Sequence, residues 1–196
     1  QKPPPLPLEK WSVRLPHYFH ENRSDETDWQ KVAAIIAMLR RLCIISGPPG
    51  TGKTTTAAKI IALLIDVHAP HSLRFAICAP TGKAAARLGE ALSAAAASLD
   101  SMSAVRSRFP TEASTIHRLL GYRNRRFIFN ATNPLPADVV VVDEASMIDL
   151  ALMAHLIAAV PPEARLIILG DHHQLSSVEA GAVLGDICQG TTPGLH

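Results

Sequence analysis

The stretch LCIISGPPGTGKTTTAAKIIALLI, residues 42–65, decides the fold class. It begins with a short apolar run at 42–46, passes through a glycine-rich loop, and continues in a helical pattern from about Thr54. A strand, a tight loop and a helix in this order are typical of one unit of a parallel sheet covered by helices. The loop itself, GPPGTGKT at 47–54, has the spacing G-x-x-x-x-G-K-[ST].

This loop predicts a phosphate-binding site. Its glycines let the backbone curl with the N–H groups pointing inward, and the following helix adds the partial positive charge of its N-terminus. Lys53 supplies a full charge for the β- and γ-phosphates of ATP, and Thr54 offers a hydroxyl to Mg²⁺. The predicted nucleotide-binding residues of this segment are Gly47, Pro48, Pro49, Gly50, Thr51, Gly52, Lys53, Thr54 and Thr55.

Three further apolar runs, at 74–79, 138–142 and 165–170, follow along the chain. Helical patterns lie before and between these runs, at 29–39, 82–99 and 150–160, and a short helix is expected within 114–121. Runs that are apolar on both faces and separated by helices indicate parallel strands buried on two sides. The sequence therefore predicts an α/β domain over 28–196, whereas residues 1–27, rich in proline and polar side chains, predict a linker.

Composition excludes several classes of protein. Hydrophobic residues make up 47% and charged residues 18% of the 196, which suits a buried core rather than a disordered chain. Cys43, Cys78 and Cys188 are odd in number and far apart, which argues against a disulfide framework and a thiolate zinc site and fits a reducing cytosol. No apolar run reaches the roughly 18 residues of a membrane helix. The net charge of +2 is small, so any nucleic-acid surface must be local.

Two carboxylates and an amide follow the third and fourth predicted strands, at the edge where ligands bind in open α/β sheets. Asp143 is expected to hold Mg²⁺, and Glu144 to orient and deprotonate the attacking water. Gln174 is expected to sense the γ-phosphate. Together with Lys53 of the loop, these three residues form the predicted catalytic set. The triplet Asp-His-His at 171–173 lacks the further carboxylates that a two-metal site needs.

Two cationic segments lie in the sequence between the phosphate loop and Asp143. APTGKAAARL at 79–88 places Lys83 near a helix start, which suits a backbone phosphate of a polynucleotide; an ordinary capped helix with a surface lysine has the same pattern. Residues 103–126 hold six of the thirteen arginines and adjoin several aromatic side chains. That combination suits single-stranded nucleic acid, and a solvated basic loop is the alternative.

Five strings together resemble a known family: GPPGTGKT, APTGKAAARL, ASTIHRLLGY, VVVVDEASMIDL and LGDHHQLSSVEAGAVLGDI. They occur in the same order in the RecD family of superfamily 1 DNA helicases, which the chain resembles from about residue 28 to 189. The resemblance implies a RecA-like P-loop NTPase domain, the first of two, that uses ATP and Mg²⁺ to move 5′→3′ along single-stranded DNA. It further implies a bacterial cytoplasmic complex with RecB and RecC that repairs double-strand breaks, with the nuclease centre on RecB and no membrane partner.

The resemblance also assigns roles by position. Gln30 would contact adenine, Thr54 and Asp143 would bind the metal, and the DNA-binding residues would be Thr81, Gly82, Lys83, Thr115, His117 and Arg118. The arginines that complete such a site come from the second domain, which is expected beyond the chain end, since residues 166–196 contain no Lys or Arg. The chain by itself is therefore expected to be a weak ATPase. A P-loop kinase and an ATP-gated DNA-binding or assembly subunit without motor activity are the alternatives.

Overall fold

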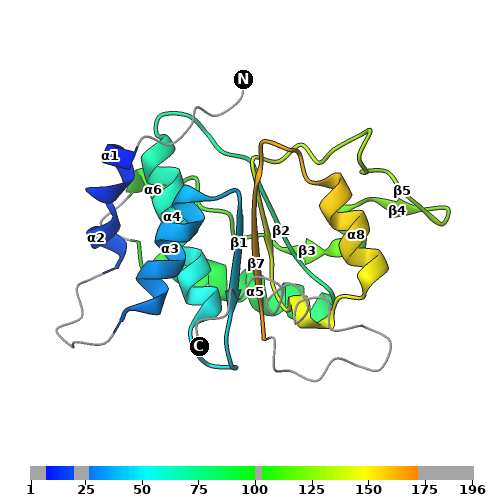
Figure 1. Cartoon of the computed structure of the whole chain (residues 1–196), viewed down its shortest axis with the longest axis horizontal. Coiled ribbons are helices and arrows are strands. Elements are labelled where there is room, and N and C mark those ends of the chain that lie inside the picture. Colours follow the sequence, from blue (N-terminus) through cyan, green and yellow to red (C-terminus); the bar gives the residue numbers. More distant parts are fainter. Residues whose placement is uncertain (1–7, 20–26, 100–102, 172–196) are drawn as a thin grey trace, which may run out of the picture.

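A computed structural model of the chain describes residues 8–19, 27–99 and 103–171. Five parallel strands form one sheet with helices on both faces, and a separate two-stranded hairpin projects beside it (Figure 1). The elements, in chain order, are α1 (Leu8–Ser12), α2 (Leu15–Tyr18), α3 (Trp29–Leu39), β1 (Leu42–Ser46), α4 (Lys53–His68), β2 (Phe75–Ala79), α5 (Gly82–Ala97), α6 (Ser103–Arg106), β3 (Ser114–Thr115), α7 (Ile116–Leu119), β4 (Tyr122–Arg123), β5 (Arg126–Phe127), β6 (Val139–Val142), η1 (Ala145–Met147), α8 (Leu150–Ala159) and β7 (Arg165–Gly170).

The strand order in the main sheet is β1-β7-β6-β2-β3, and every neighbouring pair is parallel. The four predicted apolar runs form its four longer strands, so the predicted fold class is confirmed. The fifth strand, β3, has two residues and lies where the sequence predicted the start of a short helix; α7 follows it directly. Because all strands are parallel, their carboxyl ends meet at one edge of the sheet.

Alternate residues of the central strands enter two separate cores. Val139 and Val141 of β6 pack with α3, α4 and α5, whereas Val140 and Val142 pack with α7 and α8 on the opposite face. This burial on both faces explains why the strands have no polar alternation in the sequence. Within the described residues, no helix has the length and apolar character that crossing a bilayer requires.

The first two helices differ from the prediction of a linker. Trp11, Leu15, Tyr18 and Phe19 are buried in the same core as α4, at the helical spacing i, i+4, i+7 and i+8. The prolines around these residues favoured the prediction of a linker over that of helices. Residues 8–19 are therefore packed against the domain, while 1–7 and 20–26 lie outside the described residues.

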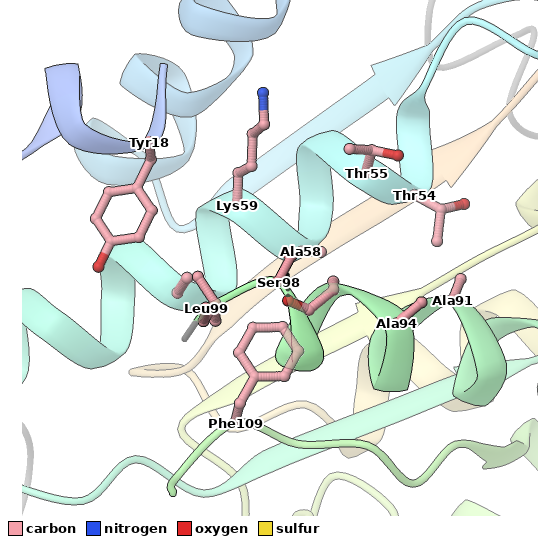
Figure 2. A pocket seen from close by; sticks show the side chains of 12 residues that line it. Tyr18, Thr54, Thr55, Ala58, Lys59, Ala91, Ala94, Ser98, Leu99 and Phe109 are labelled. Atoms are coloured by element: carbon pink, nitrogen blue, oxygen red, sulfur yellow. Dashed lines mark hydrogen bonds between the residues drawn. The ribbon is translucent and has the colours of Figure 1, made fainter. Parts of the chain in front are cut away.

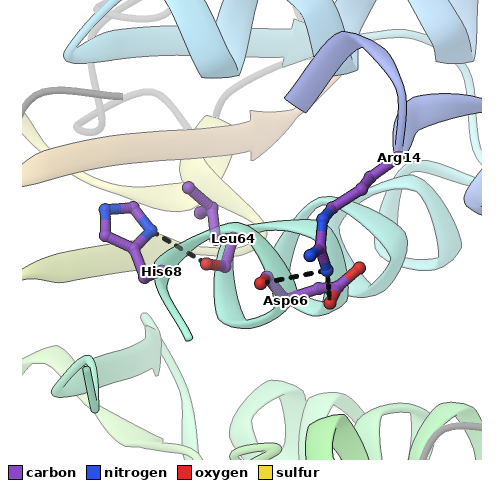
Figure 3. A network of polar contacts seen from close by, with 4 residues as sticks. All are labelled: Arg14, Leu64, Asp66 and His68. Carbon is purple, nitrogen blue, oxygen red and sulfur yellow. Dashed lines mark hydrogen bonds and ion pairs between the residues drawn. The ribbon is translucent and has the colours of Figure 1, made fainter. Parts of the chain in front are cut away.

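Polar contacts hold these helices to α4. The Arg14 guanidinium forms an ion pair with the Asp66 carboxylate and also donates to the Asp66 carbonyl oxygen (3.3 Å), as Figure 3 shows. Two residues further along α4, Nδ1 of the buried His68 lies 2.8 Å from the carbonyl oxygen of Leu64, one turn before it. Burial lowers the pKa of His68, so this ring is mostly neutral at pH 7 and donates the hydrogen bond.

Candidate functional site

The glycine-rich loop joins β1 to α4 through two residues in the left-handed region. Gly50 has φ +81° and Gly52 has φ +80°, values that residues with a Cβ rarely adopt. Gly52 precedes the first residue of α4, so the N–H groups of the first helical turn lie at the loop. A Cβ on Gly52 would lie 3.0 Å from Nε2 of Gln30, which places the predicted adenine-contacting amide beside the loop.

Lys53, the first residue of α4, extends over the loop. Its ammonium donates to the carbonyl oxygens of Gly47 (2.6 Å) and Pro48 (2.8 Å). The hydroxyl of Thr51 also donates to the Pro48 carbonyl (2.9 Å). A positive charge and several inward N–H groups therefore lie together at the carboxyl end of β1, an arrangement suited to phosphate oxygens.

Two residues far apart in sequence meet at the predicted metal site. The Thr54 hydroxyl donates to Oδ2 of Asp143 over 3.3 Å, although 89 positions separate the two residues. Oδ1 of Asp143 accepts the backbone N–H of Glu144 (2.8 Å), which fixes the carboxylate plane. A hydroxyl and a carboxylate are oxygen ligands that suit Mg²⁺. In the described ranges no three His, Cys, Asp or Glu side chains cluster.

Glu144 has an unusual backbone conformation. Its φ of +53° and ψ of +40° lie in the left-handed region, which costs a residue with a side chain about 1 kcal/mol or more. Its side chain is exposed. Strain of this kind is concentrated at functional sites, where it fixes the direction of a side chain. The conformation is compatible with a carboxylate directed at a bound ligand.

A cavity of about 550 Å³ brings together part of the predicted hydrolysis set and part of the predicted DNA-contacting set. Its lining includes Thr54, Asp143 and Glu144 as well as Thr81 and Lys83, which follow the second strand. We call it the catalytic cavity. Thr81 also caps α5, since its hydroxyl accepts the Ala84 N–H (3.2 Å), so the capped-helix alternative describes part of its role.

Arg87 also lines the catalytic cavity and was missed by the sequence analysis. It lies on α5 one helical turn after Lys83, and the i, i+4 spacing was the signal that would have identified it. A second cavity, of about 520 Å³, lies between α3 and the loop and contains Gln30, Lys53 and, also missed, the exposed Trp29. Asp28 caps this helix by accepting the N–H groups of Gln30 (3.0 Å) and Lys31 (3.1 Å).

Several predicted residues lie away from these two cavities. Thr55 lines a mainly apolar cavity between α4 and α5, whose lining also includes Ala91, Leu99 and Phe109 (Figure 2). Its neighbour Thr54 lies at the boundary, since it lines this cavity and the catalytic cavity.

The second predicted DNA-contacting segment begins in β3 and continues into α7. Thr115 caps α7, with its hydroxyl accepting the Arg118 N–H (3.2 Å), and His117 lines a further cavity beside the hairpin. Asp171, directly after β7, is buried, whereas Gln174 lies outside the described residues.

Comparisons with known proteins show which family the chain belongs to. The family profile described as "AAA domain" matches residues 30–180. The RecBCD enzyme subunit RecD of Haemophilus influenzae is 48% identical over 185 residues, which cover 91% of this chain. The ATP-dependent RecD2 DNA helicase of Deinococcus radiodurans is 45% identical over 149 residues, which cover 76% of this chain. The predicted resemblance to the RecD family is therefore confirmed.

These relatives are much longer than this chain, which spans 29% of the Haemophilus protein and 18% of the Deinococcus protein. Among solved structures, the large terminase of bacteriophage HK97 has a TM-score of 0.58 at 13% identity and covers 94% of this chain and 42% of the terminase. At that identity the likeness concerns the fold alone, and it agrees with the sheet of parallel strands.

Proposed function

We propose, on the premise that this chain belongs to the AAA domain family, that it is the first ATP-binding motor domain of a RecD-type DNA helicase subunit. The proposed reaction is hydrolysis of Mg²⁺-ATP coupled to 5′→3′ movement along single-stranded DNA. The proposed setting is a RecBCD-type complex with RecB and RecC that repairs double-strand breaks in the cytoplasm of a bacterium. Two relatives support this proposal, since one is a RecBCD enzyme subunit and the other an ATP-dependent DNA helicase.

The observation that carries the proposal is the catalytic cavity itself. It brings together Thr54 and Asp143, 3.3 Å apart, with the exposed Glu144 and the cation Lys83. Glycine-rich loops with a terminal lysine bind phosphates, and a carboxylate beside them suits water as the acceptor. A cation at the next strand end then suits the phosphates of a polynucleotide. Nucleotide hydrolysis and nucleic-acid contact thus share one space.

Each residue has a proposed task. The N–H groups of Gly50 and Gly52 and the ammonium of Lys53 bind the β- and γ-phosphates. Thr54 and Asp143 hold Mg²⁺, which when bound neutralises part of the phosphate charge. Glu144 accepts the proton of the attacking water.

Further positions are proposed to extend this site along both ligands. Gln30 contacts the adenine, Gln174 senses the γ-phosphate, and six residues contact the strand: Thr81, Gly82, Lys83, Thr115, His117 and Arg118. A second domain is proposed to supply the arginines that complete the site, so that this chain alone turns over slowly.

The proposal is tested by single-turnover phosphate release, with the chain in excess over Mg²⁺-ATP so that slow hydrolysis is measurable. Single-stranded DNA is expected to accelerate release. Glu144→Gln should slow it by about 10²–10⁴-fold, the usual contribution of a general base, while the affinity for ATP is kept. The matched control is Glu90→Gln, because Glu90 is an exposed residue of α5 that does not line the catalytic cavity.

Two results would contradict the proposal. Phosphate transfer to an added small acceptor in place of release to water would indicate a kinase. ATP binding with no turnover, equal in the parent chain and in Glu144→Gln, would indicate a nucleotide-gated binding subunit.

A further inference from the structure

Four aromatic rings from separate segments form a surface cluster beside the hairpin. They are His117 of α7, Tyr122 of β4, Phe127 of β5 and His155 of α8, and we call them the aromatic cradle. Ring centroids are 4.8 Å apart for Phe127 and His155 and 4.9 Å for Tyr122 and Phe127. His117 lies edge-on to Tyr122 at 5.5 Å. All four line one cavity of about 530 Å³.

Three of the four rings of the cradle are accessible, whereas Phe127 is half-buried and packs against the core. His117 and His155 are exposed, and Tyr122 keeps 48% of its surface in solvent. If packing were the whole role of these rings, their faces would be covered, because an aromatic ring has a large apolar area to bury. Accessible rings around a concave space suit a flat apolar ligand that stacks on them.

The cavity is also cationic. Arg125 and Arg126 line it, and they are presented by a two-residue turn in which Asn124 and Arg125 have φ values of +49° and +60°. Positive φ at both central residues gives the tight turn whose twist matches a hairpin. One carboxylate, Asp149, lines the cavity, and its Oδ1 accepts the N–H of Leu152 (2.7 Å) as the cap of α8. The ligand should therefore be flat and negatively charged.

We propose that the aromatic cradle stacks one unpaired base of a single-stranded nucleic acid, while Arg125 and Arg126 contact the adjoining phosphates. The inference rests on the proposed function and adds a base-binding site to it. The site is separate from the catalytic cavity, with which it shares no lining residue. The two spaces are nevertheless close along the chain, since Met147 lines one and Asp149 the other. One strand can therefore engage both.

Two further polar side chains line the cavity, Asn130 and Asp149, and hydrogen bonds within the chain engage both. The amide nitrogen of Asn130 donates to the Ile128 carbonyl (3.1 Å), and its oxygen accepts from the N–H (2.9 Å) and hydroxyl (2.7 Å) of Thr132. This amide and the capping oxygen of Asp149 are thus engaged by their own loop and helix. Stacking without contacts to base edges tolerates every sequence.

The test uses fluorescence anisotropy with two labelled 12-mers of equal charge, an oligothymidylate and an oligomer of the same backbone whose residues are all abasic. The parent chain should bind the thymidylate at least about five-fold more tightly, since stacking of even one base on an aromatic side chain has an effect of that size. Tyr122→Ala should remove most of this preference and leave affinity for the abasic strand unchanged. Tyr122→Phe, which keeps the ring, should retain the preference.

His155→Ala provides a second variant on a different element, and Ile157→Ala is its control on the same helix, with an exposed side chain outside the cavity. Thermal unfolding of each variant verifies the fold. Equal binding of both strands by the parent chain would contradict base stacking at the cradle and leave the proposed function standing. This comparison needs no variant. An equal loss for both strands in Tyr122→Ala, or no loss, would also overturn it. If the parent chain binds neither strand, the proposed function fails as well.

Discussion

The catalytic cavity and the aromatic cradle are neighbours, but they are built in opposite ways. In the first, Asp143 and Glu144 follow β6, which is buried along its whole length, and their directions are set by a backbone hydrogen bond and a positive φ. In the second, the rings stand on strands of two residues and on an exposed helix face. Hydrolysis needs groups fixed in direction, whereas stacking tolerates adjustment. Changes at the two places should therefore have separable effects.

The largest effect on ligand affinity at one site alone is expected from Lys53→Ala. Removing the ammonium leaves the phosphates with backbone donors and no full charge from this residue, which should weaken ATP binding by about 10- to 100-fold. The preference for thymidylate over abasic strand should not change, because Lys53 is absent from the residues that line the cradle. Lys59→Ala is the matched control on the same helix, since the Lys59 ammonium lies over the Phe19 ring at 5.2 Å from its centroid. Titration with a fluorescent ATP analogue measures the affinity, and equal losses in the two variants would contradict the assignment.

A smaller effect is expected from Gly52→Ala. A Cβ at this position would be strained by the φ of +80° and would displace the Gln30 amide, 3.0 Å away. We expect the free energy of unfolding to fall by about 1–2 kcal/mol, together with a loss of affinity for ATP. Gly82→Ala is the control, because no atom lies within 4 Å of a Cβ there and the glycine lies at the start of a helix. Urea unfolding of both variants measures the difference, and equal destabilisation would show that the backbone at Gly52 is not special.

Gly121→Ala should affect the aromatic cradle and leave the catalytic cavity unchanged. This glycine has φ +66°, and an added Cβ would lie 3.1 Å from the Cβ of Ile128, so the segment entering the hairpin must shift. The thymidylate preference should fall about two- to five-fold, as rings placed for stacking move apart, while single-turnover hydrolysis is unchanged. Asn124→Gly is the control, since glycine relieves the positive φ of that turn residue. Slower hydrolysis in Gly121→Ala with normal base preference would contradict the expectation that the two sites respond separately.

The same contrast explains what could be predicted from the sequence. The four longer strands and the phosphate loop were predictable because each is encoded by consecutive residues, as in LCIISGPPGTGKT. Asp143 was predictable because a strand end is a local feature, and its contact with Thr54 follows from parallel strands sharing one edge.

The cradle and the first helices were not predictable in the same way. His155 belongs to a helix that is apolar in sequence, and its contact with Phe127 arises from tertiary packing. Trp11 and Leu15 have helical spacing, but they stand among prolines that favour extended chain. In both regions the structure depends on what a residue packs against rather than on its neighbours in sequence.

The smallest effect is expected at the opposite edge of the sheet, where neither cavity should respond. The Arg74 guanidinium donates two hydrogen bonds to Asp138 (3.0 and 2.9 Å), and the Arg74 backbone N–H donates a third (2.8 Å). The side-chain bonds first, and then the backbone bond, hold the pKa of the Asp138 carboxyl below its ordinary value. Because the folded pKa is lowered, the stabilisation is present above the unfolded pKa and is lost as the pH falls through the folded one. Arg74→Ala should therefore lower stability by about 0.5–1 kcal/mol at pH 7, a value limited by the exposure of the pair, and by less at pH 3. Thermal unfolding at both pH values measures the difference. A change in ATP affinity or base preference in this variant would mean that the two sites respond to any loosening of the sheet, and the separation argued above would then be wrong.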